Sequence, residues 1–164
     1  MAWALSDVAG QRYLAESRVD SRAPELGQER IKNGRGAKDD RLNRAMLEVL
    51  EQGLIPVPDR VFDGAVSVPA DRLDLDYAGA RFTRRPDGSY HLHLDNPRDG
   101  SGCDLVFTPR KPATRHGDDG VVRGTGGEQM FYYFVPRCAV TGSVTVDGVA
   151  MPVATASSAG WYDH

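Results

Sequence analysis

The chain has 164 residues, 40% of them hydrophobic, and its 20 basic and 23 acidic side chains leave a net charge of −3. This length and apolar content suffice to bury one sizeable core, so we expect a single domain. The charges do not cluster strongly, which argues against a nucleic-acid partner or an anionic membrane surface. No apolar run approaches the roughly 18 residues of a membrane-spanning helix. The N-terminus lacks the pattern of a signal peptide, so the compartment stays open, with the cytoplasm as the default.

The first part of the chain predicts a β-hairpin followed by a loop. Residues 3–8 and 11–19 read as two strands around a tight turn at Ala9-Gly10. Residues 21–38 are rich in Gly, Arg and Asp and have few apolar side chains with which to pack. We therefore expect this segment to be an exposed loop.

One amphipathic helix is expected at about residues 40–52. Asp39 or Asp40 can cap its start, and Gly53 can stop it. The apolar residues between them recur at intervals of three and four: Leu42, Ala45, Met46, Val49 and Leu50. We expect the helix to pack against a sheet through Leu42, Met46 and Val49.

The rest of the chain consists of short segments of strand-forming residues separated by turn residues. Arg85-Pro-Asp-Gly-Ser89 and Asp147-Gly148 are turn signals that should each join two antiparallel strands. The expected strands are 66–68, 73–77, 80–84, 90–94, 105–108, 129–135, 139–146 and 149–154. About nine short strands beside one helix predict a mainly β fold, either an antiparallel barrel or a strongly curved sheet. No helices alternate with the strands, which disfavours a parallel α/β sheet.

The Cys and His residues leave alternatives open but give no metal motif. Cys103 and Cys138 lack the spacing of a zinc site, and they are either buried free thiols or a disulfide. His91 and His93 share one face of an expected strand, where they could bind a metal or lie on a solvated outer surface. We favour the solvated surface and predict no metal and no cofactor.

The segment Trp161-Tyr-Asp-His164 is the strongest candidate for chemistry. Alternation along a strand places Trp161 and Asp163 on one face, and Tyr162 and His164 on the other. A carboxyl group in an apolar cavity has a raised pKa and can donate a proton near neutral pH, while aromatic faces stabilise a developing cation. The alternative is that Trp161 packs in the core and Asp163 makes a structural contact, for example with Arg137.

Two further segments offer candidate ligand contacts. In Met130-Phe-Tyr-Tyr-Phe-Val-Pro-Arg137, one of Tyr132 or Tyr133 can reach a barrel interior and orient water or a carbonyl group. His116 lies in a polar loop beside two aspartates, where it acts either as a base or as part of a turn. The sequence has none of the motifs of serine hydrolases, nucleotide-binding proteins or zinc proteases.

The order of motifs from Lys111 onward, Lys-Pro, His-Gly, Tyr-Tyr, Pro-Arg, Gly-x-Val and Gly-Trp-x-Asp-His, resembles the AttH-like family, which includes carotenoid 1,2-hydratase (hydroxyneurosporene synthase). Trp3-Ala-Leu-Ser-Asp7 and residues 13–24 also resemble segments of that family. The resemblance implies a lipocalin-like barrel and a second lipocalin-like domain that this chain lacks. It therefore implies that residues 1–164 are a truncated, single lipocalin-like domain, a fragment of the N-terminal barrel.

The resemblance also implies chemistry without a cofactor on an apolar polyene, terpenoid or polyketide. A hydratase, cyclase or isomerase of this kind would use Asp163, Tyr133 and His164 as catalytic residues. Its ligand contacts would be Trp161, Tyr132, Arg137 and His116. The alternative function is a lipocalin-like module that binds a hydrophobic small molecule without transforming it. A buried Asp163 facing a cavity favours the enzyme, and a cavity with only apolar walls favours the binding module.

Overall fold

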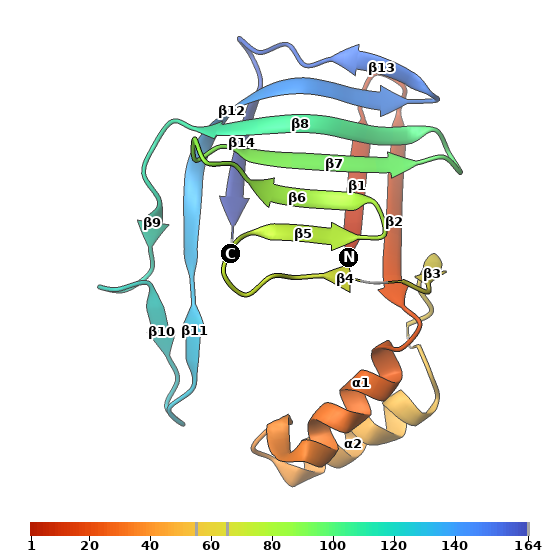
Figure 1. Cartoon of the computed structure of the whole chain (residues 1–164), viewed down its shortest axis with the longest axis vertical. Helices are drawn as coiled ribbons and strands as arrows, with labels where there is room; N and C mark the ends of the chain where they lie inside the picture. Colours follow the sequence, from red (N-terminus) through yellow and green to blue (C-terminus); the bar gives the residue numbers. More distant parts are fainter. Residues whose placement is uncertain (55, 65, 164) are drawn as a thin grey trace. The chain divides into compact units, whose positions relative to one another are not determined.

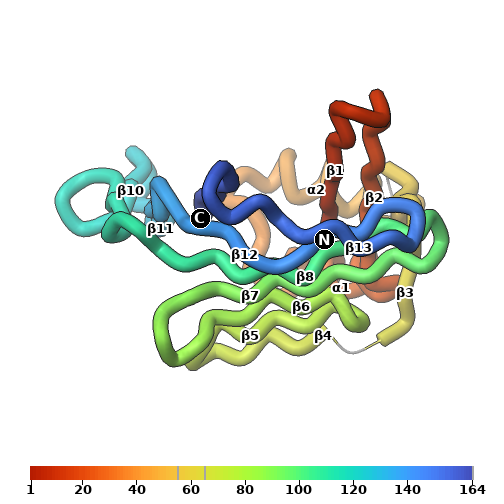
Figure 2. Tube along the Cα trace, turned by 90° about the horizontal axis from the view of Figure 1, so that it is seen from above, coloured from red at the N-terminus to blue at the C-terminus, as the bar shows by residue number. Residues whose placement is uncertain are grey.

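A computed structural model describes residues 1–54, 56–64 and 66–163 (Figures 1 and 2). The chain forms two compact units, Met1–Val66 and Ser67–His164, called here the N-terminal and C-terminal units. The single domain expected from the sequence stays a prediction. Within the described ranges, no helix is long and apolar enough to cross a membrane.

The N-terminal unit contains a three-stranded sheet in the order β1-β2-β3. The predicted hairpin is confirmed, with β1 (Ala2–Asp7) antiparallel to β2 (Arg12–Asp20). β3 (Arg60–Phe62) was not predicted, and it pairs with β2 in parallel, with Val19 opposite Val61. Parallel neighbours need a long crossover connection, which is usually helical.

The expected loop at 21–38 is wrong, because most of this segment is helical. It forms α1 (Ala23–Arg30) and the wider helical turn η1 (Ile31–Arg35), in which Gly34 adopts a φ of +70°. α1 buries no side chain, and its sequence has no apolar stripe of the kind by which a helix is usually recognised. The overlooked signals are the proline in its first turn, Glu25 near its start and Arg30 in its last turn.

The predicted helix at 40–52 is confirmed as α2 (Asp40–Glu51), capped by the Asp39 carboxylate, which accepts a hydrogen bond from the Arg41 backbone N–H at 2.8 Å. Within the N-terminal unit, Leu42, Met46 and Val49 stay 43–51% exposed. Packing of these side chains against the sheet of the C-terminal unit stays a prediction. α2 contacts α1, where Gly27 lies against the Leu50 side chain. Figure 1 shows these two helices side by side.

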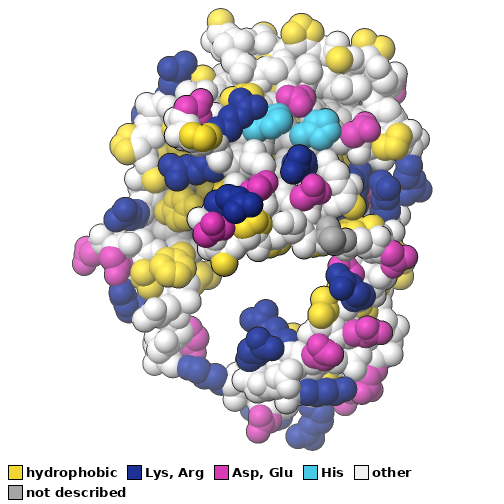
Figure 3. Space-filling model, in the orientation of Figure 1, with side chains coloured by type: hydrophobic (Ala, Val, Ile, Leu, Met, Phe, Trp, Pro, Cys, Tyr) yellow, Lys and Arg dark blue, Asp and Glu magenta, His cyan; other side chains and the backbone are white. Residues whose placement is uncertain are grey.

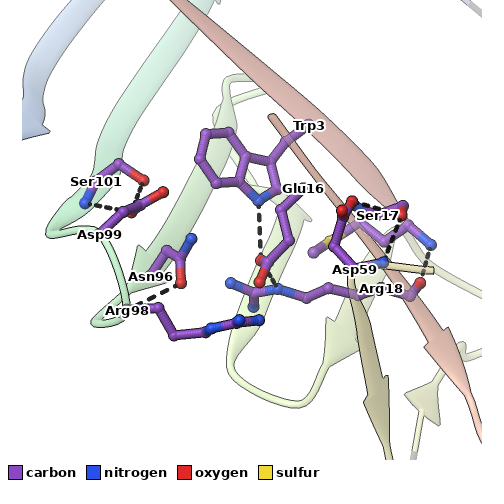
Figure 4. Close-up of polar contacts among 10 residues, drawn as sticks. Trp3, Glu16, Ser17, Arg18, Asp59, Asn96, Arg98, Asp99 and Ser101 are labelled. Atoms are coloured by element: carbon purple, nitrogen blue, oxygen red, sulfur yellow. Dashed lines mark hydrogen bonds and ion pairs between the residues drawn. The ribbon is translucent and has the colours of Figure 1, made fainter. Parts of the chain in front are cut away.

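The strands of the N-terminal unit also carry a polar cluster, drawn in Figure 4. The Trp3 indole N–H donates to Glu16 at 3.3 Å, and the Arg18 guanidinium contacts the same carboxylate. Both members of this ion pair are buried, at 5% and 3% exposure. The Ser17 N–H and hydroxyl both donate to Asp59 at 2.7 Å. These bonds connect the hairpin to the segment that leads into β3.

The C-terminal unit contains a long antiparallel path of strands in the order β13-β12-β8-β7-β6-β5-β4, with β14 and β9 also paired to β12. The last of these strands, β4, begins at the boundary between the two units. A separate hairpin is formed by β10 and β11. The bounds are β4 Val66–Ser67, β5 Asp74–Tyr77, β6 Ala80–Arg84, β7 Tyr90–Asn96, β8 Ser101–Pro109, β9 Thr114–Arg115, β10 Val121–Arg123, β11 Gln129–Phe131, β12 Tyr133–Val146, β13 Val149–Pro152 and β14 Ala159–Asp163.

Both predicted turns form as expected. Gly88, with a φ of +82°, lies in the Arg85–Ser89 turn, which joins β6 and β7 and is closed by the Arg85 N–H on the Ser89 carbonyl at 2.8 Å. Asp147 and Gly148 both have positive φ and connect β12 to β13 as a two-residue hairpin loop. Short polar bonds such as Ser101 N–H to Asp99 at 2.9 Å close the β7–β8 turn (Figure 4).

β12 is the longest strand, and it bends at a β-bulge. Pro136 and Arg137 together face the single residue Trp161 of β14, between the pairs Val135–Tyr162 and Cys138–Gly160. A proline is tolerated here because the bulge requires no ladder hydrogen bond from it, and the extra residue turns the strand. Beyond the bulge, β14 runs across the direction of β6, β7 and β8 (Figure 1).

The mainly β, antiparallel fold predicted from the sequence is confirmed. The barrel is not closed, because the described strands form open sheets in which β13 and β4 end the path. The apolar core of the C-terminal unit lies on one face of this sheet and includes Ala80, Tyr90, Leu94, Cys138, Val140 and Val146.

At Gly142, β12 lies close to the backbone of β8. Its φ is +115°, and a Cβ atom there would lie 2.0 Å from the Asp104 carbonyl oxygen. Gly142→Ala should therefore lower the free energy of unfolding by about 3 kcal/mol, because both the backbone strain and the clash must be relieved. Gly148→Ala is the matched control, since Gly148 also has positive φ but no atom within 4 Å, and it should cost about 1 kcal/mol. Urea unfolding checks both variants, and equal losses would contradict the proposed clash.

Candidate functional site

An aromatic cavity lies in the C-terminal unit where β14 crosses the sheet. Its volume is about 170 Å³. Five strands contribute to its walls: β6, β7, β8, β12 and β14. The lining residues are Phe82, Tyr90, Leu92, Phe107, Cys138, Trp161 and Tyr162. The ladder explains why these side chains meet, since Phe82 is opposite Leu92 and Tyr90 is opposite Phe107, and opposite residues share a face.

Three rings of the cavity are nearly parallel. Tyr90 and Tyr162 have centroids 5.2 Å apart and planes 14° apart, while Phe82 lies 5.9 Å from Tyr90 and 5.7 Å from Tyr162. Tyr133 adds a tilted ring 5.9 Å from Tyr162. Offset stacking of this kind is the favourable geometry for aromatic rings and fixes the direction of the walls.

Burial controls the protonation of the polar groups in this cavity. It raises the pKa of the Tyr90 phenol and of the Cys138 thiol. The pKa of Tyr162 is raised strongly, first by burial and then by a hydrogen bond with Tyr133. All three groups therefore remain neutral at physiological pH.

Gly160 allows β14 to lie close to the sheet. A Cβ atom at this position would lie 2.8 Å from the Phe107 ring and 3.3 Å from a Val140 methyl group. Any larger residue would lift β14 away from the sheet or push the Phe107 ring aside. Gly160 is thus a condition for the cavity, a role that the motif Gly-Trp-x-Asp-His does not reveal by itself.

The expectation that Trp161 and Asp163 face an interior together is not met in the described chain. Tyr162 is the residue of this segment that stacks into the sheet, whereas Trp161 is 73% exposed and Asp163 is also exposed. The sequence correctly predicted that Trp161 and Tyr162 point to opposite faces of the strand, but it predicted the wrong residue as the inward one. The pairing next to the bulge in β12 determines which face of β14 points inward, because Val135 is buried and Tyr162 is its direct partner. Trp161 contributes to the cavity lining from its rim.

Four of the predicted site residues nevertheless share the opposite face of the bent sheet. The His116 ring stacks on Tyr132 at 4.1 Å with planes 21° apart, and it lies 6.0 Å from Phe134. Phe134 is opposite Asp163, and Trp161 shares the face of Asp163 by alternation. His116, Tyr132, Phe134, Trp161 and Asp163 form what we call the outer aromatic face.

The remaining predicted residues lie elsewhere. Tyr133 faces the cavity side and contacts Tyr162, so it is the inward member of the Tyr132–Tyr133 pair. Arg137 is exposed at the bulge. His164 lies outside the described residues. The catalytic and ligand roles of all seven residues stay predictions.

Sequence reasoning missed most of the cavity wall. Phe82, Tyr90, Leu92 and Phe107 were expected only as strand residues, because each is an ordinary apolar position in an alternating pattern. A signal was present, since Tyr90 and Leu92 alternate with His91 and His93, which marks the side of β7 away from the histidines as the apolar one.

The two cysteines are free, and Cys138 is almost fully buried. Cys103 is opposite Val144, whereas Cys138 is opposite Pro109, so the two lie six residues apart along the same ladder. At roughly 3.3 Å per residue this is about 20 Å, far beyond the reach of a disulfide. Burial, with the nearby Asp104 charge, raises the pKa of Cys103 to about 11.

His91 and His93 lie on the solvated outer face of the sheet, as we favoured from the sequence (Figure 3). Each imidazole contacts one oxygen of Asp104, at 3.0 and 3.2 Å. The hydrogen bond from His91, followed by that from His93, holds the Asp104 pKa below its ordinary range. Among the described residues, no group of three or more His, Cys, Asp or Glu side chains is arranged to hold a metal ion.

Comparison with known proteins shows a partial likeness to a solved structure. No protein-family model and no curated protein matches the sequence. Among solved structures, the chain is similar to a protein from Nitrosomonas europaea provisionally described as AttH, with 24% identity and a TM-score of 0.48. The match covers 56% of this chain and 28% of that one, so the chain spans less than a third of the solved protein. A relation to carotenoid hydratase stays a prediction.

The contacts of His91 and His93 with Asp104 should make the free energy of unfolding depend on pH. Because the folded-state pKa of Asp104 is lowered, its contribution is present above the ordinary aspartate pKa and is lost as the pH falls through the lowered value. Asp104→Asn should thus destabilise the protein near pH 5 by less than about 1 kcal/mol, since the pair is exposed and screened. The difference from wild type should shrink towards pH 2. Urea unfolding at low salt measures it, with the exposed Asp118→Asn as control. If the difference in the free energy of unfolding between Asp104→Asn and wild type does not change with pH, the predicted stabilisation by the ionised Asp104 is wrong.

Proposed function

We propose that the C-terminal unit binds an apolar small molecule in the aromatic cavity. The observation that carries the proposal is the composition of the wall, in which stacked rings and a buried thiol surround the space and no charged side chain takes part. Ligand sites of proteins are commonly concave and lined by apolar and aromatic groups. The binding-module hypothesis from the sequence is therefore the better supported of the two.

The protonation of the wall supports binding rather than catalysis at this cavity. Its ionisable groups are phenols and a thiol, and burial raises the pKa of Tyr90, Cys138 and Tyr162. A phenol or thiol with a raised pKa stays protonated at neutral pH, so it is not available as a base. It is also too weak an acid to donate a proton readily. Asp163, the carboxyl group proposed as an acid, lies on the other face of β14.

A second candidate is a hydratase, cyclase or isomerase that acts on a polyene, terpenoid or polyketide. The observation in its favour is the outer aromatic face, where Asp163 shares a surface with Trp161, Tyr132 and His116. A carboxyl group among aromatic faces is the combination that cation chemistry needs. This candidate requires additional protein to cover the face, because a carboxylic acid donates a proton near neutral pH only where it is shielded from water.

Binding at the aromatic cavity can be tested by NMR. Titration of the ¹⁵N-labelled chain with toluene and, separately, with oleyl alcohol should give saturable shifts for at least one probe. The shifts should be concentrated at cavity residues such as Tyr90 and Phe107, since a bound apolar molecule changes the surroundings of the wall residues that it contacts. Tyr162→Ser should weaken binding at least fivefold by removing one wall.

Tyr13→Ser is the matched control for that variant, because Tyr13 is 69% exposed in the N-terminal unit and should leave binding unchanged. If neither probe shifts the cavity residues, or if both variants behave alike, the proposed function is wrong.

The catalytic candidate is tested in a longer homologue that carries both expected barrels. Asp163→Asn should abolish turnover of a carotenoid substrate while leaving apolar ligand binding nearly unchanged, because the amide keeps the shape but donates no acidic proton. Product analysis and ligand titration together measure the two effects. Retained turnover would remove Asp163 from the catalytic role.

A further inference from the structure

We infer that the aromatic cavity takes a compact, neutral and flat ligand built on a single six-membered ring, and not an extended polyene or acyl chain. This inference rests on the proposed binding function and specifies its ligand class. It follows from three independent properties of the cavity: its size, the direction of its walls and its lack of charge.

The size of the cavity sets the first limit. Its volume of about 170 Å³ is close to the roughly 150 Å³ of an engineered apolar cavity that binds benzene. Pockets for drug-sized ligands are larger, from about 300 Å³ upward. A single ring therefore fits within these walls, whereas a long chain would leave most of its length in water.

The stacked rings set the shape. Phe82, Tyr90 and Tyr162 have planes 10–22° apart and centroids 5.2–5.9 Å apart, so they pack on one another as one cluster of nearly parallel rings. A flat ring that lies against this cluster in the cavity can stack on it with its whole face, which is a favourable geometry for aromatic rings. A branched or puckered molecule of equal volume cannot lie flat against such walls.

The lack of charge sets the polarity. The wall consists of aromatic rings, Leu92 and the Cys138 thiol, so an ionised carboxylate or ammonium group on the ligand would lose its hydration without gaining a counter-charge. Fatty acids and amino acids are therefore poor ligands. Neutral benzenoid compounds are the class that satisfies all three properties.

The experiment compares toluene, naphthalene and retinol by NMR titration of the wild-type chain, with isothermal calorimetry as the second measurement. Toluene should bind at the cavity residues with a Kd on the order of 0.1–1 mM, as expected for so few heavy atoms. Naphthalene and retinol should bind there at least tenfold more weakly.

Enlarging the cavity should change this order in a predictable way. Phe107→Leu removes part of one wall, and naphthalene should then bind at least fivefold more tightly than in wild type. Leu92→Val is a second enlargement, which keeps the contact between Phe107 and Gly160. Phe131→Leu is the matched control, because Phe131 is 65% exposed in the β10–β11 hairpin outside the cavity. A gain in affinity cannot be mistaken for unfolding.

The outcomes separate this inference from the function on which it rests. If retinol binds the cavity residues as tightly as toluene does, the one-ring ligand class is wrong while the binding function stands. If neither enlarged variant gains affinity for naphthalene, cavity size does not select the ligand and the inference fails. If no probe shifts the cavity residues, the proposed function itself fails.

Discussion

The bend of β12 is the feature on which the C-terminal unit depends. One half of this strand pairs with β8 and β13, and the other half pairs with β9 and β14. The two-residue bulge at Pro136 and Arg137 turns the strand between these halves and carries β14 across the sheet. Without the turn, β14 would extend the flat sheet by one strand, Tyr162 would have no ring beneath it, and no cavity would form.

The bulge also divides the aromatic residues between two surfaces with different chemistry. Tyr133 and Tyr162 face the sheet, where burial keeps the Tyr162 phenol neutral, while Tyr132 stacks on His116 on the other side and Trp161 lies at the edge of the cavity. A shift of one residue in this register would exchange the two sets, because side chains alternate along a strand. The neutral aromatic pocket and the outer aromatic face are thus two sides of one strand pair.

Local patterns predicted most of the fold, and long-range pairing accounts for what they missed. The Arg85–Ser89 turn, the Asp147–Gly148 hairpin and the helix capped by Asp39 each depend on residues close in sequence. The face of β14 that points inward depends on a bulge in another strand, which no period within Gly160–Asp163 reveals. α1 was missed because its contact with α2 rests on a glycine rather than on an apolar stripe. The wall residues from β6, β7 and β8 become a site only when β14 covers them.

The parallel pairing of β2 with β3 bears on how the N-terminal unit acquires its fold. Its partners are separated by the whole segment from Ser21 to Asp59, so the pairing must overcome the entropy of closing a long loop. α1 and α2 shorten that loop, because a helix rises only about 1.5 Å per residue and the two helices run back along each other. We therefore expect the helical pair to form before β3 docks, which makes the kinetics of this unit sensitive to substitutions at Gly27 and Leu50, although neither residue lies in the sheet.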